Sequence, residues 1–277
     1  MESRVPDTDL YGLLFAKLSI RRNVPARAIN RLFQAFSSSR RVSAKGDMVV
    51  EGAHTSTCMF LTSGFCARYR LLVDGRRQFT EICIPGDFVN LGSFLKKRQP
   101  QGLIALTDCR TAIISHSALD RLICEEPELM RSLWLETLVD GAISREWVLS
   151  LGVQNAKERF ARFFCELFMR MEIVGLTEGD GFRLPMTQTE MSDMLGMSAV
   201  HVNRIIGELR EEGLIEMCGG RVRLPDLAAL AAVGEFDAAY LETPADLLRA
   251  IAQTQVTDGP QPPVSRLSLS APLTKVT

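Results

Sequence analysis

The stretch from Met186 to Leu224 limits the possible folds of this chain more than any other. Thr187 and Glu190 have the spacing of a capping box, in which each side chain binds a backbone amide at a helix start. Gly196 then permits a left-handed turn, and Ser198 can cap a second helix. This order predicts two short helices joined by a tight turn.

The second predicted helix has an apolar side and a polar side. Its apolar side chains recur at the i, i+3, i+4, i+7 spacing of one buried face, and they are Val202, Ile205, Ile206 and Leu209. After Gly213 ends the helix, two short strand-like runs flank Gly219-Gly220 and predict a β-hairpin. Helix, turn, helix and hairpin in this order is typical of a winged helix-turn-helix.

The polar side of that helix has side chains suited to reading DNA. An α-helix fits the major groove and points its first turns at base edges, where Arg204 matches guanine and Asn203 matches adenine. Hydroxyls and amides at the helix starts and an arginine on the hairpin suit phosphates. An ordinary helical hairpin with a solvated polar face is the alternative. The predicted DNA-contacting residues are Thr187, Thr189, Ser198, Val200, His201, Asn203, Arg204 and Arg221, with Arg223 as a further hairpin cation.

Residues 45–116 are predicted to form a small antiparallel β-barrel or β-roll, because Gly and Asp punctuate short β-rich runs. Asp74-Gly75 between two of these runs predicts a hairpin with a two-residue turn. That turn fixes the opposed pairs as Phe65–Ile84, Cys66–Cys83, Ala67–Ile82 and Arg68–Glu81. The two cysteines are interpreted as reduced thiols rather than as a redox switch, because we expect a reducing compartment.

The remaining segments are predicted to be mostly helical. Residues 8–37 have the pattern of two helices, and residues 117–152 that of a short helix followed by a long one beginning near Pro127. Along the long helix runs an apolar stripe of Met130, Leu133, Trp134, Leu138, Ala142, Leu149 and Leu151. We predict that this stripe is a dimerisation seam; packing on the chain's own β domain is the alternative.

The predicted fold is therefore α+β, with five segments in series. They are N-terminal helices (1–44), a β-roll sensor domain (45–116), a long dimerisation helix (117–152), a winged helix-turn-helix (153–228) and a C-terminal extension (229–277). Residues 241–251 are a candidate short helix within the extension. From Thr254 onwards, Pro, Ser, Thr and Gly predict disorder.

Composition narrows the class of protein. The 277 residues have a net charge of −1, and no apolar run approaches the roughly 20 residues of a membrane helix. Because the N-terminus also lacks a signal-peptide pattern, we expect a cytoplasmic protein. The seven cysteines and three histidines show no metal-ligand spacing, so no metal site is expected. Nucleophile-elbow, phosphate-loop and HExxH motifs are absent, so we expect no enzyme activity.

The segment MTQTEMSDMLGMSAVHVNRIIGELREEGLIE resembles the DNA-binding signature of the Crp/Fnr family of bacterial regulators. The GDF at Gly86–Phe88 and the long helix that follows the β-roll resemble that family too, over roughly residues 10–235. The resemblance implies a homodimer that binds a palindromic double-stranded DNA site and often contacts RNA polymerase. Arg204 matches the arginine shared by most recognition helices of the family.

The chain departs from the family at the positions that set its subgroups. Ala199 and Val200 stand where relatives of the cyclic-AMP receptor have Arg-Glu, and Val200 and Asn203 stand where Fnr-like members have Glu and Ser. We therefore do not assume that this chain recognises the DNA half-site of either subgroup. The operator, and the choice between activation and repression, stay open.

The effector also stays unassigned. Cyclic-nucleotide binders of the family have Gly-Glu after GDF and an Arg-Ser or Arg-Ala pair later, whereas this chain has Val89–Gly92 and Arg98–Gly102 there. With the carboxylate partner missing, we expect no cyclic-nucleotide binding. The first cysteine is Cys58, so an Fnr-type N-terminal cluster is not expected, and His54 and His116 are interpreted as ordinary histidines rather than haem ligands. The alternative function is a small-molecule or cyclic-nucleotide sensor with weak or lost DNA binding.

Overall fold

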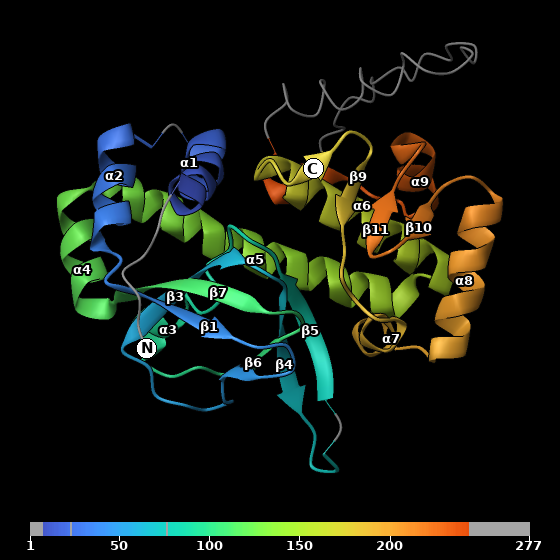
Figure 1. Ribbon diagram of the computed structural model, residues 1–277, viewed down its shortest axis with the longest axis horizontal. Helices are drawn as coiled ribbons and strands as arrows, with labels where there is room; N and C mark the ends of the chain where they lie inside the picture. The colour runs from blue at the N-terminus through green and yellow to red at the C-terminus, as the bar shows by residue number, and fades with distance from the viewer. Residues whose placement is uncertain (1–7, 23, 76, 244–277) are drawn as a thin grey trace, which may run out of the picture.

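The computed structural model describes residues 8–22, 24–75 and 77–243, which form two N-terminal helices, a β-roll and a helical C-terminal part (Figure 1). The N-terminal helices are α1 (Thr8–Arg22) and α2 (Ala26–Ala35), as the sequence predicts. Their inner faces bury Leu14, Leu18, Ile29 and Leu32 in the main core. None of the helices described here is both long and apolar enough to span a lipid bilayer.

The β-roll consists of two antiparallel sheets, which confirms the predicted fold class. One sheet has the order β1–β7–β3, formed by β1 (Ser38–Val42), β7 (Cys109–Ser115) and β3 (Thr57–Ser63). The other has the order β2–β6–β4–β5, formed by β2 (Asp47–Val49), β6 (Gly102–Ala105), β4 (Cys66–Leu71) and β5 (Arg77–Cys83). The short helix α3 (Ser93–Lys96) follows the GDF turn. Because β1 begins at Ser38, the roll starts before the predicted boundary at residue 45.

The β4–β5 hairpin has the predicted pairs but not the predicted turn. Cys66 lies opposite Cys83, Ala67 opposite Ile82, and Arg68 opposite Glu81, whereas Phe65 and Ile84 lie beyond the ladder. The ladder ends at Leu71 and Arg77, so the connection is longer than two residues. A β-bulge between Arg68 and Tyr69 shifts the register and compensates for the longer turn. The Asp74-Gly75 signal thus gave the right partners through an incorrect turn.

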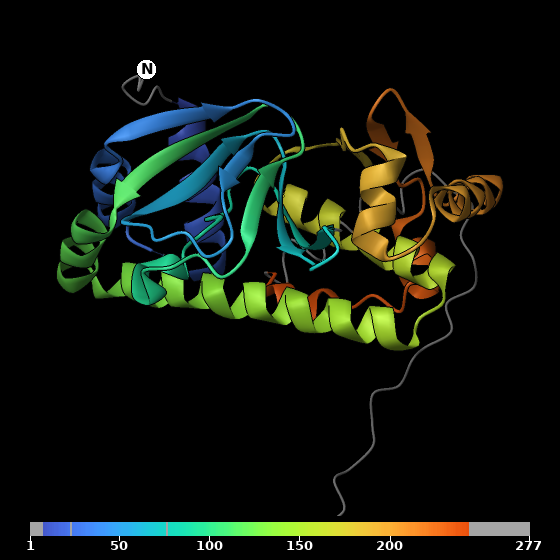
Figure 2. The same cartoon turned by 90° about the horizontal axis from the view of Figure 1, so that it is seen from below.

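A long helix connects the β-roll to the C-terminal part. After α4 (His116–Glu125), α5 (Pro127–Val153) starts with proline in its first turn, and it runs along both the β-roll and the C-terminal helices (Figure 2). One side of α5 is buried through Leu129, Leu133, Val139 and Ile143. Elsewhere along the helix large apolar side chains are exposed, namely Met130, Trp134, Leu138, Val148, Leu149, Leu151 and Val153. Leu133 therefore belongs to the core and not to the predicted stripe.

The C-terminal part has the order of a winged helix-turn-helix. It contains α6 (Ala156–Ile173), β8 (Thr177–Glu178), β9 (Gly181–Arg183), α7 (Gln188–Leu195), α8 (Ala199–Glu211), β10 (Glu216–Cys218) and β11 (Arg221–Arg223). The wing is more than the predicted hairpin, since β9 and β8 extend it into a four-stranded sheet of order β10–β11–β9–β8.

The predicted boundary at residue 229 is wrong, because the fold continues beyond it. Helix α9 (Leu227–Val233) spans that position and packs against α6, and the 3-10 helix η1 (Ala238–Leu241) follows. Leu230 and Leu241 are fully buried, so these segments are part of the core. The rest of the candidate helix at 241–251 and the tail from Thr254 lie outside the described residues.

Candidate nucleic-acid interface

Both helices of the helix-turn-helix begin with the caps that the sequence predicts. Thr187 Oγ1 accepts from the Glu190 amide at 3.2 Å, and the Glu190 carboxylate accepts from the Thr187 amide at 2.7 Å. Gly196 adopts the left-handed conformation at φ 64° between the helices. Ser198 Oγ accepts from the His201 amide at 3.3 Å and caps α8. These bonds satisfy amides that the first turns leave without helical partners.

The aliphatic quartet anchors α8 in the core. Val202, Ile205, Ile206 and Leu209 are all buried, and they contact the same core as Met191 and Met194 of α7. A helix fixed on one face turns its other face outward. Val200 is accordingly 80% exposed, and Asn203 and Arg204 are exposed as well.

The outward face of α8 holds Arg204 between two neighbours. Its Nη2 lies 2.8 Å from His201 Nε2, and its Nη1 donates to the Glu208 carboxylate. Because a guanidinium only donates hydrogen bonds, His201 Nε2 accepts, and the ring proton of the neutral imidazole is on Nδ1. The four predicted base-reading residues, Val200, His201, Asn203 and Arg204, thus lie together along the first two turns of α8.

The predicted phosphate-binding residues flank this face. Thr187 and Thr189 are exposed at the start of α7, although Thr187 Oγ1 is already engaged in the capping box. On the wing, Arg221 pairs with Glu178 at 2.5 Å. Arg223 pairs with Asp180 at 2.8 Å and with Glu216 at 2.7 Å. The wing arginines are therefore exposed but neutralised by neighbouring carboxylates.

Sequence reasoning missed Arg183 as a possible phosphate-binding residue. It is exposed on β9, directly opposite Arg221 of β11, and has no side-chain partner among the residues that the structure describes. Because Arg221 is already paired with Glu178, Arg183 is the wing cation whose charge is not offset by a described carboxylate. The Glu178–Gly181 segment, with its alternating glycines, was the turn signal that could have revealed the β8–β9 hairpin.

Two family models match the chain, one on each side of α5. Residues 40–126 match the model described as cyclic nucleotide-binding domain, and residues 158–233 match the model described as Crp-like helix-turn-helix domain. The chain belongs to the Crp/Fnr family. It is a DNA-binding transcriptional regulator, and members of this family are not enzymes.

Individual relatives and a solved structure agree with this family. The chain is 29% identical over 205 residues to a probable transcriptional activator of Rhizobium leguminosarum bv. viciae, covering 74% of this chain and 82% of the relative. It is 29% identical to the nitrogen fixation regulation protein FixK of Azorhizobium caulinodans, covering 66% and 72%. In fold it is similar to FixK2 from Bradyrhizobium japonicum, with a TM-score of 0.62 and 22% identity over 72% of this chain and 98% of the other.

In this Crp/Fnr chain, the side chains at the positions of the family's nucleotide-binding motif form hydrogen bonds within the β-roll. Asn90, just after GDF, accepts from the Met59 amide at 2.7 Å and donates to the Thr57 carbonyl at 2.9 Å. Arg98 Nε donates to the Gly52 carbonyl at 2.9 Å. Both side chains therefore hold loops of the β-roll together. The sequence has no glutamate just after GDF, where the cyclic-nucleotide binders of the family have one.

The two histidines considered for haem also have internal contacts. His116 is buried, with Nε2 at 3.3 Å from Ser93 Oγ and its ring edge-on to Phe94. Burial is the main reason that the pKa of His116 is lowered. His54 forms an isolated β-bridge with Arg98. Within the described part of the chain, no three His, Cys, Asp or Glu side chains form a group that could hold a metal ion.

A buried ionic cluster connects the β-roll to the regulator's C-terminal domain. Asp87 of the GDF turn binds Lys17 of α1 at 2.7 Å and Arg170 of α6 at 2.9 Å. Arg170 also binds Glu166 at 3.2 Å, and Lys17 binds Glu136 of α5 at 3.2 Å. Because these charges are removed from water, their mutual arrangement is strongly constrained.

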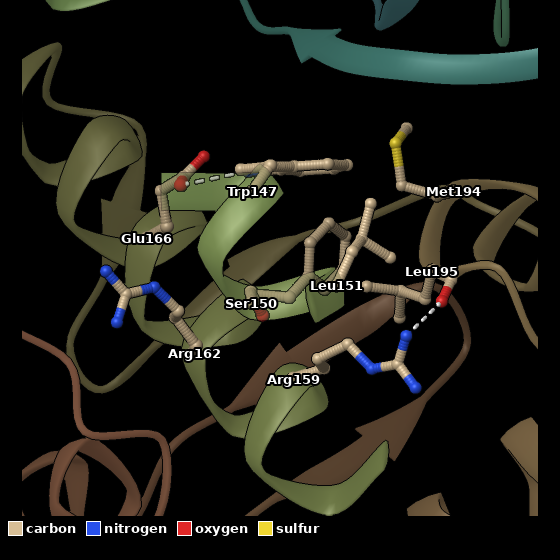
Figure 3. A pocket seen from close by; sticks show the side chains of 9 residues that line it. Trp147, Ser150, Leu151, Arg159, Arg162, Glu166, Met194 and Leu195 are labelled. Atoms are coloured by element: carbon tan, nitrogen blue, oxygen red, sulfur yellow. Dashed lines mark hydrogen bonds between the residues drawn. The ribbon is translucent and has the colours of Figure 1, made fainter. Parts of the chain in front are cut away.

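A second junction lies where α5, α6 and α7 meet. Trp147 of α5 donates from its indole nitrogen to Glu166 at 3.1 Å, and Arg159 of α6 donates to the Leu195 carbonyl at 3.3 Å (Figure 3). The cavity between them has a volume of about 20 Å³, which is room for about one water molecule. On the β-roll side, Gln78 of β5 donates to the Asp193 carbonyl of α7 at 2.9 Å. Helix α7 of the helix-turn-helix is thus hydrogen-bonded to α6 and to the β4–β5 hairpin, and α6 in turn is hydrogen-bonded to α5.

Proposed function

We propose that the chain regulates transcription as a homodimer that inserts one copy of α8 into each of two successive major grooves of a palindromic operator. In each half-site, Arg204 and Asn203 bind base edges, His201 adds a donor from Nδ1, and Val200 contacts a thymine methyl. The observation that carries this proposal is the exposed polar face of α8, which faces outward because its aliphatic quartet is buried.

The wing and the helix starts complete each proposed half-site. Thr187, Thr189 and Ser198 provide hydroxyls and amides for one DNA strand, and Arg221 with Arg183 provides cations for flanking phosphates. Such contacts fix the position of a protein on the duplex but carry no sequence information. Specificity is therefore assigned to α8 alone.

The proposed homodimer forms along α5. Met130, Trp134 and Leu138 stand one helical turn apart and are 42%, 60% and 54% exposed. Next to them, an apolar cleft of about 410 Å³ opens between α3 and α5. A stripe of this kind on a long helix is costly in water, and a second α5 covers it. Pairing two copies also supplies the two recognition helices that a palindrome needs.

The proposed outcome of binding is activation. Of the similar proteins described above, one is named a probable transcriptional activator and another a nitrogen fixation regulation protein. Activation implies a contact with RNA polymerase, and a site of action where chromosomal DNA is found, the bacterial cytoplasm. The effector is left open in this proposal.

A mobility-shift experiment tests the recognition face. Selection from a random duplex pool with the purified protein provides the operator probe. Arg204→Ala and Asn203→Ala should each abolish specific binding, while circular dichroism stays unchanged. Arg210→Ala is the matched control, because Arg210 is exposed near the end of the same helix and should only weaken binding slightly. Full specificity in both test variants would reject the assigned face.

A further inference from the structure

Three arginines of the proposed DNA face are each engaged by a carboxylate of the same domain. Arg204 pairs with Glu208, Arg221 with Glu178, and Arg223 with both Asp180 and Glu216. Glu178 and Glu216 come from other strands of the wing sheet, Asp180 from the turn between β8 and β9, and Glu208 from the recognition helix itself. The positive charges that we propose contact DNA are therefore partly neutralised in the protein without DNA.

The charge of the whole domain agrees with this arrangement. Residues 153–228 contain nine Lys or Arg and twelve Asp or Glu. Attraction to phosphates of any sequence grows with the number of cations that displace counterions. A domain with an excess of acidic groups gains little from this attraction, so its affinity depends on the few contacts that are geometrically correct.

The Arg204–Glu208 pair stabilises the helix less than the reverse order of the two residues would. Ion pairs on helices stabilise better when the acidic residue precedes the basic one, and here Arg204 precedes Glu208. Glu208 also lies in the second half of α8, where the helix dipole disfavours a negative charge. A residue that opposes two local preferences indicates a role outside local stability.

We propose that Glu208 is a specificity-determining residue, which positions Arg204 and lowers the attraction of α8 to DNA of the wrong sequence. This inference rests on the proposed function of Arg204. Glu208 holds Nη1 of the guanidinium while His201 holds Nη2 at 2.8 Å, so both ends of the group are fixed along the helix face. A fixed guanidinium loses less side-chain entropy when it meets guanine.

The same carboxylate acts against non-specific binding. Beside a phosphate backbone, the negative charge of Glu208 offsets the positive charge of Arg204, so a non-specific complex gains little from this pair. At the correct base, the guanidinium forms two directed hydrogen bonds that a phosphate does not replace with the same geometry. Glu208 therefore weakens wrong complexes more than the right one.

The test is Glu208→Gln in the full-length protein, with Glu211→Gln as the matched control. Both changes remove one negative charge from α8, but Glu211 is exposed and has no side-chain partner among the described residues. Affinity is measured at several salt concentrations for the selected operator and for a scrambled duplex of the same length. Thermal unfolding of each variant accompanies these measurements.

We expect Glu208→Gln to raise affinity for the scrambled duplex about three- to tenfold and for the operator less, so that the ratio of the two falls at least about threefold. Glu211→Gln should shift both affinities alike and keep the ratio. An unchanged ratio in Glu208→Gln, or equal changes of the ratio in both variants, overturns the inference. If Arg204→Ala keeps specific binding, the proposed function itself fails; if it abolishes binding while Glu208→Gln keeps the ratio, only the role of Glu208 fails.

Discussion

The Arg170 guanidinium of α6 donates to the Asp87 carboxylate of the β-roll across 2.9 Å, and both side chains are buried. This ion pair is a direct polar contact between the two parts of the chain that the family models recognise separately. Burial opposes the ionisation of Asp87, but Lys17 and Arg170 together hold its pKa well below the usual range. The carboxylate is therefore ionised at neutral pH.

Asp87→Asn should strongly destabilise the protein. It leaves Lys17 and Arg170 buried with one carboxylate fewer, and breaking a buried ion pair in this way costs about 3–5 kcal/mol. Urea unfolding at neutral pH measures the change. Asp120→Asn is the control, since Asp120 is exposed, and its effect should stay within about 0.5 kcal/mol. Equal stabilities of the two variants would contradict a central role for the cluster.

Stability should depend on pH through Glu81. Burial raises the pKa of Glu81 to about 7, despite the adjacent Arg68 guanidinium. This pKa in the folded state lies above the unfolded-state value of about 4.3, so protonation of Glu81 stabilises the folded protein. The contribution to the free energy of unfolding is complete below about pH 4.3 and is lost as the pH rises through about 7. Glu81→Gln removes this pH dependence. The free energy of unfolding of the variant, relative to that of the wild type, should therefore rise by about 2 kcal/mol between pH 5 and pH 8. Urea unfolding midpoints of both proteins at pH 5 and pH 8 measure this difference. Parallel pH profiles of the variant and the wild type would refute the prediction.

Trp134→Glu should convert the proposed dimer into monomers. A charge in the centre of an apolar seam stays unpaired when two helices meet. Burying this charge costs more free energy than burial of the apolar side chains of the seam contributes. Sedimentation velocity measures the oligomeric state, and operator affinity should fall with it. Val50→Glu is the control, because Val50 is an equally accessible apolar residue of the β-roll, 61% exposed. A dimeric Trp134→Glu protein would show that α5 is not the seam.

Two glycines of the helix-turn-helix should respond in opposite directions to alanine. Gly196 has φ 64°, so an added Cβ is strained there, and Gly196→Ala should cost about 1 kcal/mol. Gly207 lies within α8 with nothing within 4 Å of an added Cβ, so Gly207→Ala should stabilise by about 0.5–1 kcal/mol. Thermal unfolding compares them, and stabilisation by both changes would argue against the left-handed turn.

Local signals in the sequence were enough to predict the helix-turn-helix. The capping box of Thr187 and Glu190, the turn at Gly196 and the quartet on α8 involve residues a few positions apart. Caps and periodic burial depend on short-range geometry, which the order of residues fixes directly. The pairing of Arg68 with Glu81 was predicted too, but only because a bulge offsets a longer turn, and neither of these was predicted.

The sequence by itself determined the helix-turn-helix, the buried face of α8 and the main helices and strands of the β-roll part, but not the β8–β9 hairpin or α9. Tertiary structure decided which of them meet: Arg170 with Asp87, 83 positions apart, Arg183 with Arg221 across the wing sheet, and α9 with α6. These contacts depend on how whole helices and strands pack, and no local periodicity specifies that packing. The sequence alone does not show which carboxylates pair with an arginine such as Arg223. The folded structure does, because it brings Asp180 and Glu216 next to Arg223.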